Sequence, residues 1–271
     1  MQNQENKSFT SKLLKLRDEI DAIDSTILDL LHKRFDIVAK VKNLKDDQRD
    51  MFYIKSAREA DMIKSLIKQS SGKLPSSLII DIWRKIISFA NCSEQKIKIA
   101  LHNPDKTPNL KYALRSYYNG IIPIITHDTV SSVVMDLESN KAQIAVFALP
   151  KNKNDEIAKD WWISLANNTA AIKVFAKIPM ENDSQDHDLV ALAIKDVEKS
   201  SDDNSLLCIE TSGEISENQF ISDLSASFND FKLLKSHKSK KYNNNSFYLV
   251  EIKGFLDETN QKGAEILNQA E

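Results

Sequence analysis

The sequence predicts a multidomain protein: an all-α three-helix region over residues 1–97, an α/β region over 98–200 and an α+β region over 201–271. Two observations predict this division. Apolar residues recur every three or four positions through the first third, which is the period of an amphipathic helix. From Lys96 onward, segments of strand length alternate with helical segments, which is typical of sheets covered by helices.

A single long helix is expected from about Ser11 to Lys45. No proline or glycine interrupts residues 1–71. The helix would be about 50 Å long at ~1.5 Å per residue, which exceeds the width of a small domain. A second copy of the same helix can cover its apolar stripe along the whole length, so we predict an intertwined homodimer through this helix. The stripe consists of Leu13, Leu16, Ile20, Ile23, Ile27, Leu30, Ile37, Val41 and Leu44.

Arg34 stands in this stripe where an apolar residue is expected. A cation on an apolar seam is costly unless it is paired, so Arg34 belongs either to a structural ion pair or to an anion site. Lys45 follows three helical turns later and points the same way. Arg17 lies about 100° round the helix from Arg34, so it faces away from that pocket and could serve the pocket of the other chain.

Two shorter helices are expected next, over about 56–69 and 76–95, separated by the stop signal Ser-Gly-Lys-Leu-Pro. Ser56 and Glu59 have the spacing of a capping box, which is one interpretation of Glu59. Glu94 occupies an apolar-stripe position of the third helix. There it either meets water at a frayed helix end or belongs to a polar site.

The composition argues against several classes of function. The net charge of −2 gives no sign of a nucleic-acid partner, although the first third is positive and the remainder negative, which suits a small anionic ligand. The five glycines are too scattered for a phosphate loop, and the five histidines never have metal-ligand spacing. Two distant cysteines exclude a disulfide framework and indicate a reducing compartment. The polar first residues and short apolar runs predict a cytoplasmic protein without a membrane partner.

Several polar residues follow one another in a fixed order through the first third: Arg17, Arg34, Lys45, Arg58, Glu59 and Glu94. This ordered set, over about residues 9–97, resembles the all-helical chorismate mutases. The resemblance implies a dimeric isomerase that converts chorismate to prephenate by an intramolecular rearrangement, without a cofactor, metal or nucleophile. Catalysis would come from holding the flexible substrate in its reactive shape and from stabilising negative charge on the breaking ether oxygen.

The resemblance also implies a role for each of these residues. Arg17 of the partner chain and Arg34 would grip the two substrate carboxylates, which a guanidinium fork fits well. Lys45 would contact a carboxylate and the ether oxygen. Arg58 would add positive potential, and Glu59 would accept a hydrogen bond from the ring hydroxyl. The predicted catalytic residues are Arg34, Lys45 and Glu94.

Two positions depart from the family's pattern. Glu94 stands where the family often has glutamine, whose amide donates to the ether oxygen at any pH, whereas a glutamate donates only when protonated. Activity should therefore fall as rising pH ionises Glu94, unless Gln95 takes that role. Lys55, three residues before Arg58, stands where relatives often have Asp or Arg, and we include it among the substrate-binding residues.

The remaining two thirds resemble, by their order of elements, a lobe of prephenate dehydratase followed by an ACT-type regulatory region. The most similar stretch runs from Ile144 to Pro150. A helix over 155–167 follows, with Trp161-Trp162 predicted to serve packing, and then the segment 172–176 within a strand predicted over 171–178. The family's Thr-Arg-Phe catalytic motif would fall at residues 187–189, where none of the three matches. We therefore interpret this lobe as degenerate and non-catalytic.

The ACT-like region is expected to contain strands near 205–210, 232–236 and 247–253, with helices at 217–228 and 260–268. The basic run from Lys235 to Lys241 is interpreted as a solvated hairpin. The effector-binding motifs of the ACT family are not visible in it, so feedback regulation stays open.

Three hypotheses about function remain at this point. The first is a chorismate mutase with a non-catalytic C-terminal part, and the second is a bifunctional mutase–dehydratase. The third is a regulator that binds a ligand without turnover. Arg34 together with Lys45 argues against the third, although a binding protein could keep both.

Overall fold

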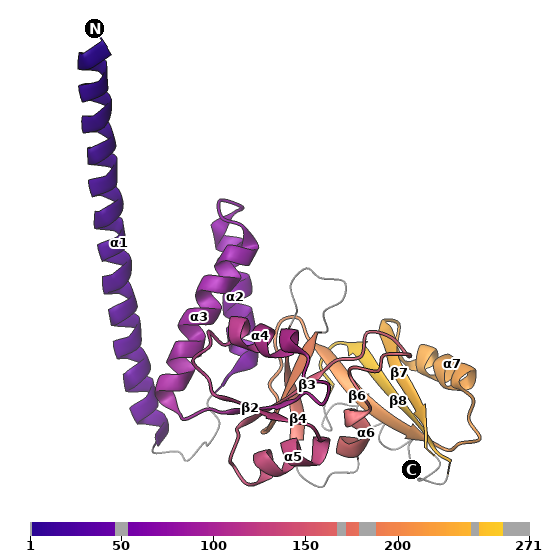
Figure 1. The fold of residues 1–271 in the computed structure, drawn as a ribbon. Helices are drawn as coiled ribbons and strands as arrows, with labels where there is room; N and C mark the ends of the chain where they lie inside the picture. The colour runs from indigo at the N-terminus through magenta and orange to yellow at the C-terminus, as the bar shows by residue number, and fades with distance from the viewer. Residues whose placement is uncertain (1, 47–53, 167–171, 179–187, 240–243, 257–271) are drawn as a thin grey trace. The chain divides into compact units, whose positions relative to one another are not determined.

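The computed structural model describes residues 2–46, 54–166, 172–178, 188–239 and 244–256, and the side chains of the first helix over 9–44. The chain forms two compact units, residues 1–53 and 54–271 (Figure 1). Within the described ranges, no helix combines the length and the apolar character needed to cross a bilayer.

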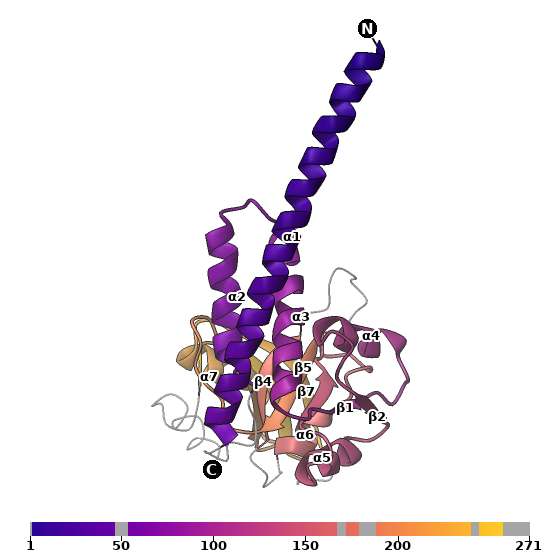
Figure 2. The same cartoon turned by 90° about the vertical axis from the view of Figure 1, so that its left-hand side faces the viewer.

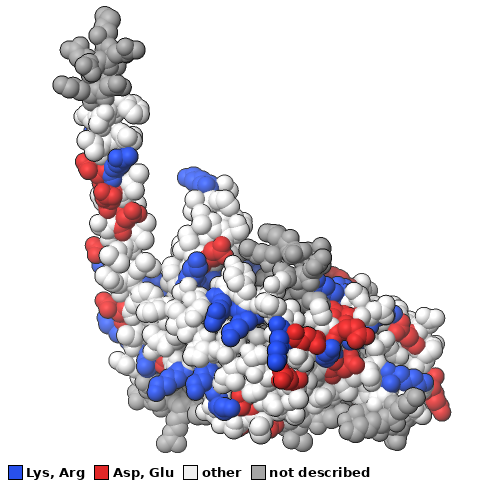
Figure 3. Space-filling view, in the orientation of Figure 1, with Lys and Arg blue, Asp and Glu red and all other residues white. Residues whose placement is uncertain are grey.

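The first unit contains α1 (Gln2–Asp46), one uninterrupted helix of 45 residues. The sequence predicted this helix, and the structure extends it further toward the N-terminus. Its apolar stripe lies open in the single chain, since exposed fractions run from 36% at Leu13 to 71% at Leu44. Both basic and acidic side chains occur on the visible face of α1, with uncharged surface between them (Figure 3).

The second unit begins with a helical hairpin of α2 (Ser56–Ser70) and α3 (Ser76–Glu94), which lie side by side in Figures 1 and 2. The predicted capping box is wrong. Lys55 is the N-cap of α2, and no side chain caps that end. Glu59 turns instead toward α3, because polar partners there hold its carboxylate. The buried positions of the hairpin are Ala57, Ile63, Ile79, Ile87, Ser88 and Ala90.

A five-stranded sheet follows, with the order β2-β1-β3-β5-β4. Four strands run in the same direction, whereas β5 runs antiparallel to its two neighbours, β3 and β4. The strands are β1 (Ile99–His102), β2 (Ile124–His127), β3 (Ile144–Ala148), β4 (Ile172–Ile178) and β5 (Leu189–Ile194). The α/β organisation predicted from the sequence is confirmed. No strand was predicted at β5, which lies between β3 and β4.

Helices cover both faces of this sheet: α4 (Pro108–Tyr117), α5 (Val130–Glu138) and α6 (Trp161–Ala166). The chain moves from β1 outward to β2 and then back across to β3. Right-handed crossovers in opposite directions place their helices on opposite faces, as α4 and α5 lie in Figure 1.

The helix predicted over 155–167 is shorter in the structure, since α6 begins only at Trp161. The Asp155 carboxylate accepts hydrogen bonds from the backbone N–H groups of Lys151, Ile157 and Ala158. These bonds stabilise a turn in place of the first helical turns. Trp161 and Trp162 are each 2% exposed, which agrees with the predicted packing role.

A second sheet has the antiparallel order β6-β8-β7. Its elements are β6 (Asn204–Thr211), α7 (Glu217–Ser227), β7 (Phe231–Lys238) and β8 (Ser246–Lys253). The helix predicted at 260–268 lies outside the described residues.

The central strand β8 joins two cores because alternate side chains of a strand point to opposite faces. Phe247 and Leu249 pack into the core that contains Phe147 of β3 and the two tryptophans of α6. Tyr248, Val250 and Ile252 pack under α7 instead. The two sheets therefore share one apolar core within the second unit.

The interpretation of Lys235–Lys241 as a solvated hairpin is wrong at its first residue. Lys235 is only 9% exposed. Its Nζ donates to the Asp155 backbone carbonyl at 2.6 Å and pairs with Asp160 at 3.1 Å. A buried ammonium is tolerated there because oxygen acceptors surround it.

Asp136 ties α5 to the edge of the parallel strands. Its carboxylate lies 2.7 Å from Nε2 of His127 and 3.1 Å from Nζ of Lys141. The residue is only 2% exposed. Burial by itself would raise the pKa of this carboxyl, but the hydrogen bonds from Lys141 and His127 outweigh it and lower the pKa.

The substitution Asp136→Asn is expected to destabilise the fold by about 2 kcal/mol, because His127 and Lys141 lose a charged acceptor. Since the folded-state pKa lies below the ordinary value of 3.8, the carboxylate stabilises the fold above that pH and loses this effect in acid. Urea unfolding should therefore show a cost for the variant that shrinks as pH falls. Asp105→Asn is the control, because Asp105 is an exposed carboxylate that pairs with Lys159 at 3.3 Å. An equal loss of unfolding free energy in that variant would contradict this account.

Candidate functional site

Three of the predicted site residues lie on α1 of the first unit. Arg17 is exposed, and Arg34 is half-buried with its guanidinium carbon 5.8 Å from the ring centre of Phe35. Lys45 belongs to the last turn of α1, and its side chain lies outside the described part of the chain. The continuous helix keeps Arg34 within the apolar stripe, as the heptad spacing predicted.

The carboxylate of Glu59, a predicted site residue in the second unit, contacts two polar side chains of α3. Its Oε1 accepts a hydrogen bond from Nδ2 of Asn91 at 3.0 Å, and its Oε2 lies 3.3 Å from Nη1 of Arg84. Both partners come from α3, so this contact ties α3 to α2. The side chains of Glu59 and Arg84 are 14% and 19% exposed. Neither Arg84 nor Asn91 was predicted to be a site residue.

The environment of Glu59 favours its neutral form. Burial raises the pKa of the carboxyl above its ordinary value of 4.5, because the charged form loses water. The hydrogen bond from Asn91 and the positive charges of Arg84 and Lys195 oppose that rise, whereas the charge of Glu94 adds to it. Glu59 and Glu94 are therefore electrostatically coupled across the α2–α3 hairpin.

Three other predicted residues of the second unit have different surroundings. Lys55 pairs with Glu198 at 2.7 Å, and both side chains are more than one third exposed. Arg58 is exposed. Glu94 is the last residue of α3 and is half-buried, as is Gln95 at the C-cap. The structure thus brings Glu94 near Glu59, while Lys55 and Arg58 lie toward solvent.

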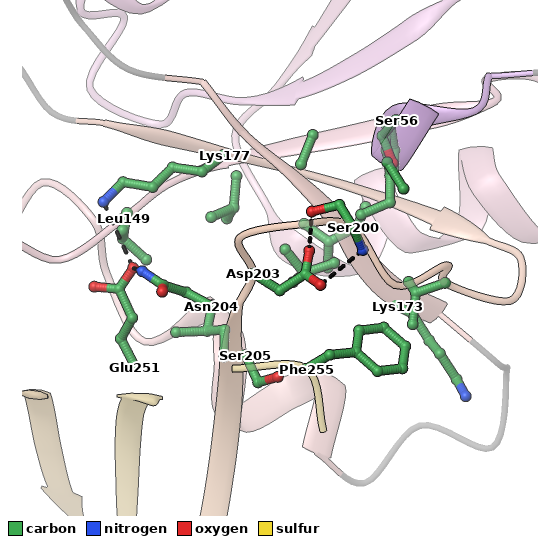
Figure 4. A pocket seen from close by; sticks show the side chains of 18 of the residues that line it. Ser56, Leu149, Lys173, Lys177, Ser200, Asp203, Asn204, Ser205, Glu251 and Phe255 are labelled. Carbon is green, nitrogen blue, oxygen red and sulfur yellow. Dashed lines mark hydrogen bonds and ion pairs between the residues drawn. The ribbon is translucent and has the colours of Figure 1, made fainter. Parts of the chain in front are cut away.

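A cavity of about 690 Å³ extends from this hairpin to the space between the two sheets. Glu59, Arg84 and Tyr117 line it on the helical side. Toward the sheets its polar groups pair with one another, as Figure 4 shows: Glu251 lies 3.7 Å from Lys177, and Asp203 accepts from the Ser200 N–H at 2.7 Å. Glu59 and Arg84 therefore face space that a small molecule could enter.

Within the described ranges, no three His, Cys, Asp or Glu side chains gather in a way that could hold a metal ion. The two cysteines are free thiols, and burial raises the pKa of each, that of Cys208 to about 12.

The family model of chorismate mutase type II matches residues 16–95. Those residues form a chorismate mutase type II domain. The match begins one residue before Arg17 and ends at Gln95, so it includes every polar position selected from the sequence.

Curated relatives extend the similarity beyond this domain. The bifunctional chorismate mutase/prephenate dehydratase of Aquifex aeolicus is 27% identical over 139 residues, 50% of this chain and 38% of the relative. The T-protein of Enterobacter agglomerans is 36% identical over 87 residues, 32% of this chain and 23% of the relative. The chain therefore matches well under half the length of either relative. The crystal structure of prephenate dehydratase from Streptococcus mutans has a TM-score of 0.42 and 16% identity, covering 64% of this chain and 89% of that one.

The raised pKa of Glu59 predicts a pH-dependent contribution to stability. A carboxyl whose pKa is higher in the folded state favours folding most below the unfolded value, near 4.5, and loses that effect as pH rises through the folded pKa. Replacing Glu59 by glutamine removes the titration. The free energy of unfolding of Glu59→Gln, relative to the parent, should therefore rise between about pH 4 and pH 7 in urea titrations. A difference that stays constant or falls over this range would contradict the prediction.

Proposed function

We propose that this protein converts chorismate to prephenate, at a site that two copies of the chain complete together. The match of residues 16–95 to the chorismate mutase type II family carries this proposal. The exposed stripe of α1 supports the dimeric part, because an apolar helix face open along its whole length favours association with a second helix.

We expect catalysis to come from restraint of the substrate's shape and from electrostatic stabilisation of the charge that develops in the transition state. Arg17 from the partner chain and Arg34 would bind the two carboxylates of the substrate and hold it in its compact, reactive shape. Lys45 and protonated Glu94 would stabilise the negative charge that develops on the ether oxygen. Glu59 would accept the ring hydroxyl's hydrogen bond, and Lys55 and Arg58 would add positive potential around the dianion.

The reaction requires no metal or cofactor, and the domain division at 97/98 and 200/201 and the cytoplasmic location stay predictions. We infer no catalytic role for residues 98–271 in this first candidate function.

A bifunctional mutase–dehydratase is the second candidate function. The match of 139 residues to the Aquifex aeolicus relative is longer than the helical region of 97 residues, so it includes part of the α/β region. Against this candidate stands the absence of the Thr-Arg-Phe motif at 187–189.

One assay separates these candidates. The full chain is incubated with chorismate, the loss of chorismate absorbance is followed, and the products are analysed. Prephenate as the sole product supports the first candidate, and phenylpyruvate supports the second. An unchanged chorismate signal would contradict both and favour a regulator that binds without turnover.

A further inference from the structure

Arg84 is a cation in contact with Glu59 to which neither the sequence pattern nor the family resemblance gave a role. With Asn91, it holds both oxygens of the Glu59 carboxylate, through contacts of 3.3 and 3.0 Å. A carboxylate held at both oxygens has little rotational freedom. The direction in which Glu59 can accept a further hydrogen bond is therefore fixed by these two residues of α3.

Arg84 is itself supported from outside the α2–α3 hairpin. Its guanidinium carbon lies 4.6 Å from the ring centre of Tyr117, at the end of α4. The Tyr117 backbone carbonyl also accepts a hydrogen bond from Oγ of Ser88 on α3, at 3.5 Å. A guanidinium stacked on an aromatic face away from water is attracted by the ring, and this contact favours one orientation of the Arg84 side chain.

These contacts form one chain of support from α4 through Arg84 to Glu59. Tyr117 lies beyond residue 95, where the match to the mutase family ends. All three residues also line the same cavity, so the supported carboxylate faces space open to a small molecule.

We propose that Arg84, seated on the ring of Tyr117, is a positioning residue for the mutase reaction: it aims the Glu59 carboxylate at the substrate's ring hydroxyl. This inference rests on the proposed function. It gives the α/β region a part in the mutase site, since α4 supplies the surface on which Arg84 rests.

Two pairs of variants of the full chain test the proposal. Arg84→Gln should lower kcat/KM for chorismate by about 10- to 100-fold, the effect expected of a misplaced binding group. Arg84→Lys keeps the charge but not the planar fork, so it should recover part of that loss. Tyr117→Leu should lower kcat/KM by about 10-fold, whereas Tyr117→Phe keeps the ring and should match the parent.

The pH profile separates positioning from a purely structural effect. Ionised Glu59 is a stronger acceptor for the ring hydroxyl than the neutral acid, so kcat/KM should fall in acid. Arg84→Gln removes a positive neighbour and should move that acid limb to higher pH, while Arg84→Lys should leave it in place. Tyr112→Leu is the matched control, because Tyr112 lies on the same helix with 74% of its surface exposed.

The outcomes are distinguishable. If the parent turns over chorismate but folded Arg84→Gln keeps its kcat/KM and acid limb, the positioning role is wrong and the proposed function stands. An equal loss in Tyr117→Phe and Tyr117→Leu would refute the support by the aromatic ring. If the parent does not turn over chorismate, the proposed function fails and this role fails with it.

Discussion

Arg34→Ala is expected to lower kcat/KM for chorismate by about 1,000-fold, which corresponds to about 4 kcal/mol. Arg34 stands in the apolar stripe of α1, where a helix pairing with a second copy would shield it from water. A guanidinium that binds a carboxylate in such a place makes two parallel hydrogen bonds, and alanine can make neither. The measurement is steady-state turnover of chorismate by the full chain.

Two further variants make this result specific. Lys33→Ala removes the adjacent, exposed cation of α1 and should leave turnover within about twofold of the parent. Arg34→Lys retains the charge but loses the fork, so it should stay well below the parent. If Arg34→Ala were as active as Lys33→Ala, Arg34 would be a structural residue and the anion site would have to lie elsewhere.

Placing two glutamates on the stripe, Ile23→Glu with Ile27→Glu, should convert the expected dimer into a monomer and abolish turnover. Both isoleucines are at least 50% exposed in the single chain. Burying each would contribute about 2 kcal/mol per chain, and a buried carboxylate would be strongly unfavourable. Turnover depends on the dimer because Arg17 is expected to come from the other chain.

Sedimentation equilibrium measures the mass of the parent and of the double variant, and the chorismate assay measures the turnover of each. Ser25→Glu is the control, because it places a glutamate on the opposite side of α1 and should leave the dimer intact. A monomeric parent protein would contradict the shared site directly. A dimeric double variant would show that the contact between copies uses another surface.

Some features of the fold could be predicted because they depend on local spacing. The long helix follows from a stripe with steps of three and four and from the lack of proline and glycine up to residue 71. The strands β3 and β8 follow from short apolar runs bounded by turn residues. The order of cations on α1 likewise follows from helical geometry alone.

Other features depend on partners far away in the sequence. The run Leu189–Ile194 is short and wholly apolar, a pattern that does not by itself distinguish a strand from a buried helix segment. Its place between β3 and β4 arises from pairing with both. Asp155 was expected to begin a helix, but its carboxylate forms a turn with three backbone N–H groups.

In the candidate site, the role of Glu59 also depends on partners far away in the sequence. By spacing, it could be a capping-box residue of α2 or a ligand of the substrate, and local sequence cannot choose between these roles. The structure excludes the cap, because α3 offers the carboxylate an amide and a guanidinium. The raised pKa of Glu59 is likewise a property of burial among these neighbours, and no local pattern predicts it.

By itself, the sequence determined that this chain begins with a long amphipathic helix carrying cations on and beside its apolar stripe, and that an ordered set of polar residues places 16–95 in a mutase family. These features depend on spacing along one helix and on residue order. The tertiary structure alone decided that Arg84 rests on Tyr117 and holds Glu59. The physical reason is that packing of α2, α3 and α4 brings together residues 25 and 33 positions apart, and burial then sets their charges and their orientation.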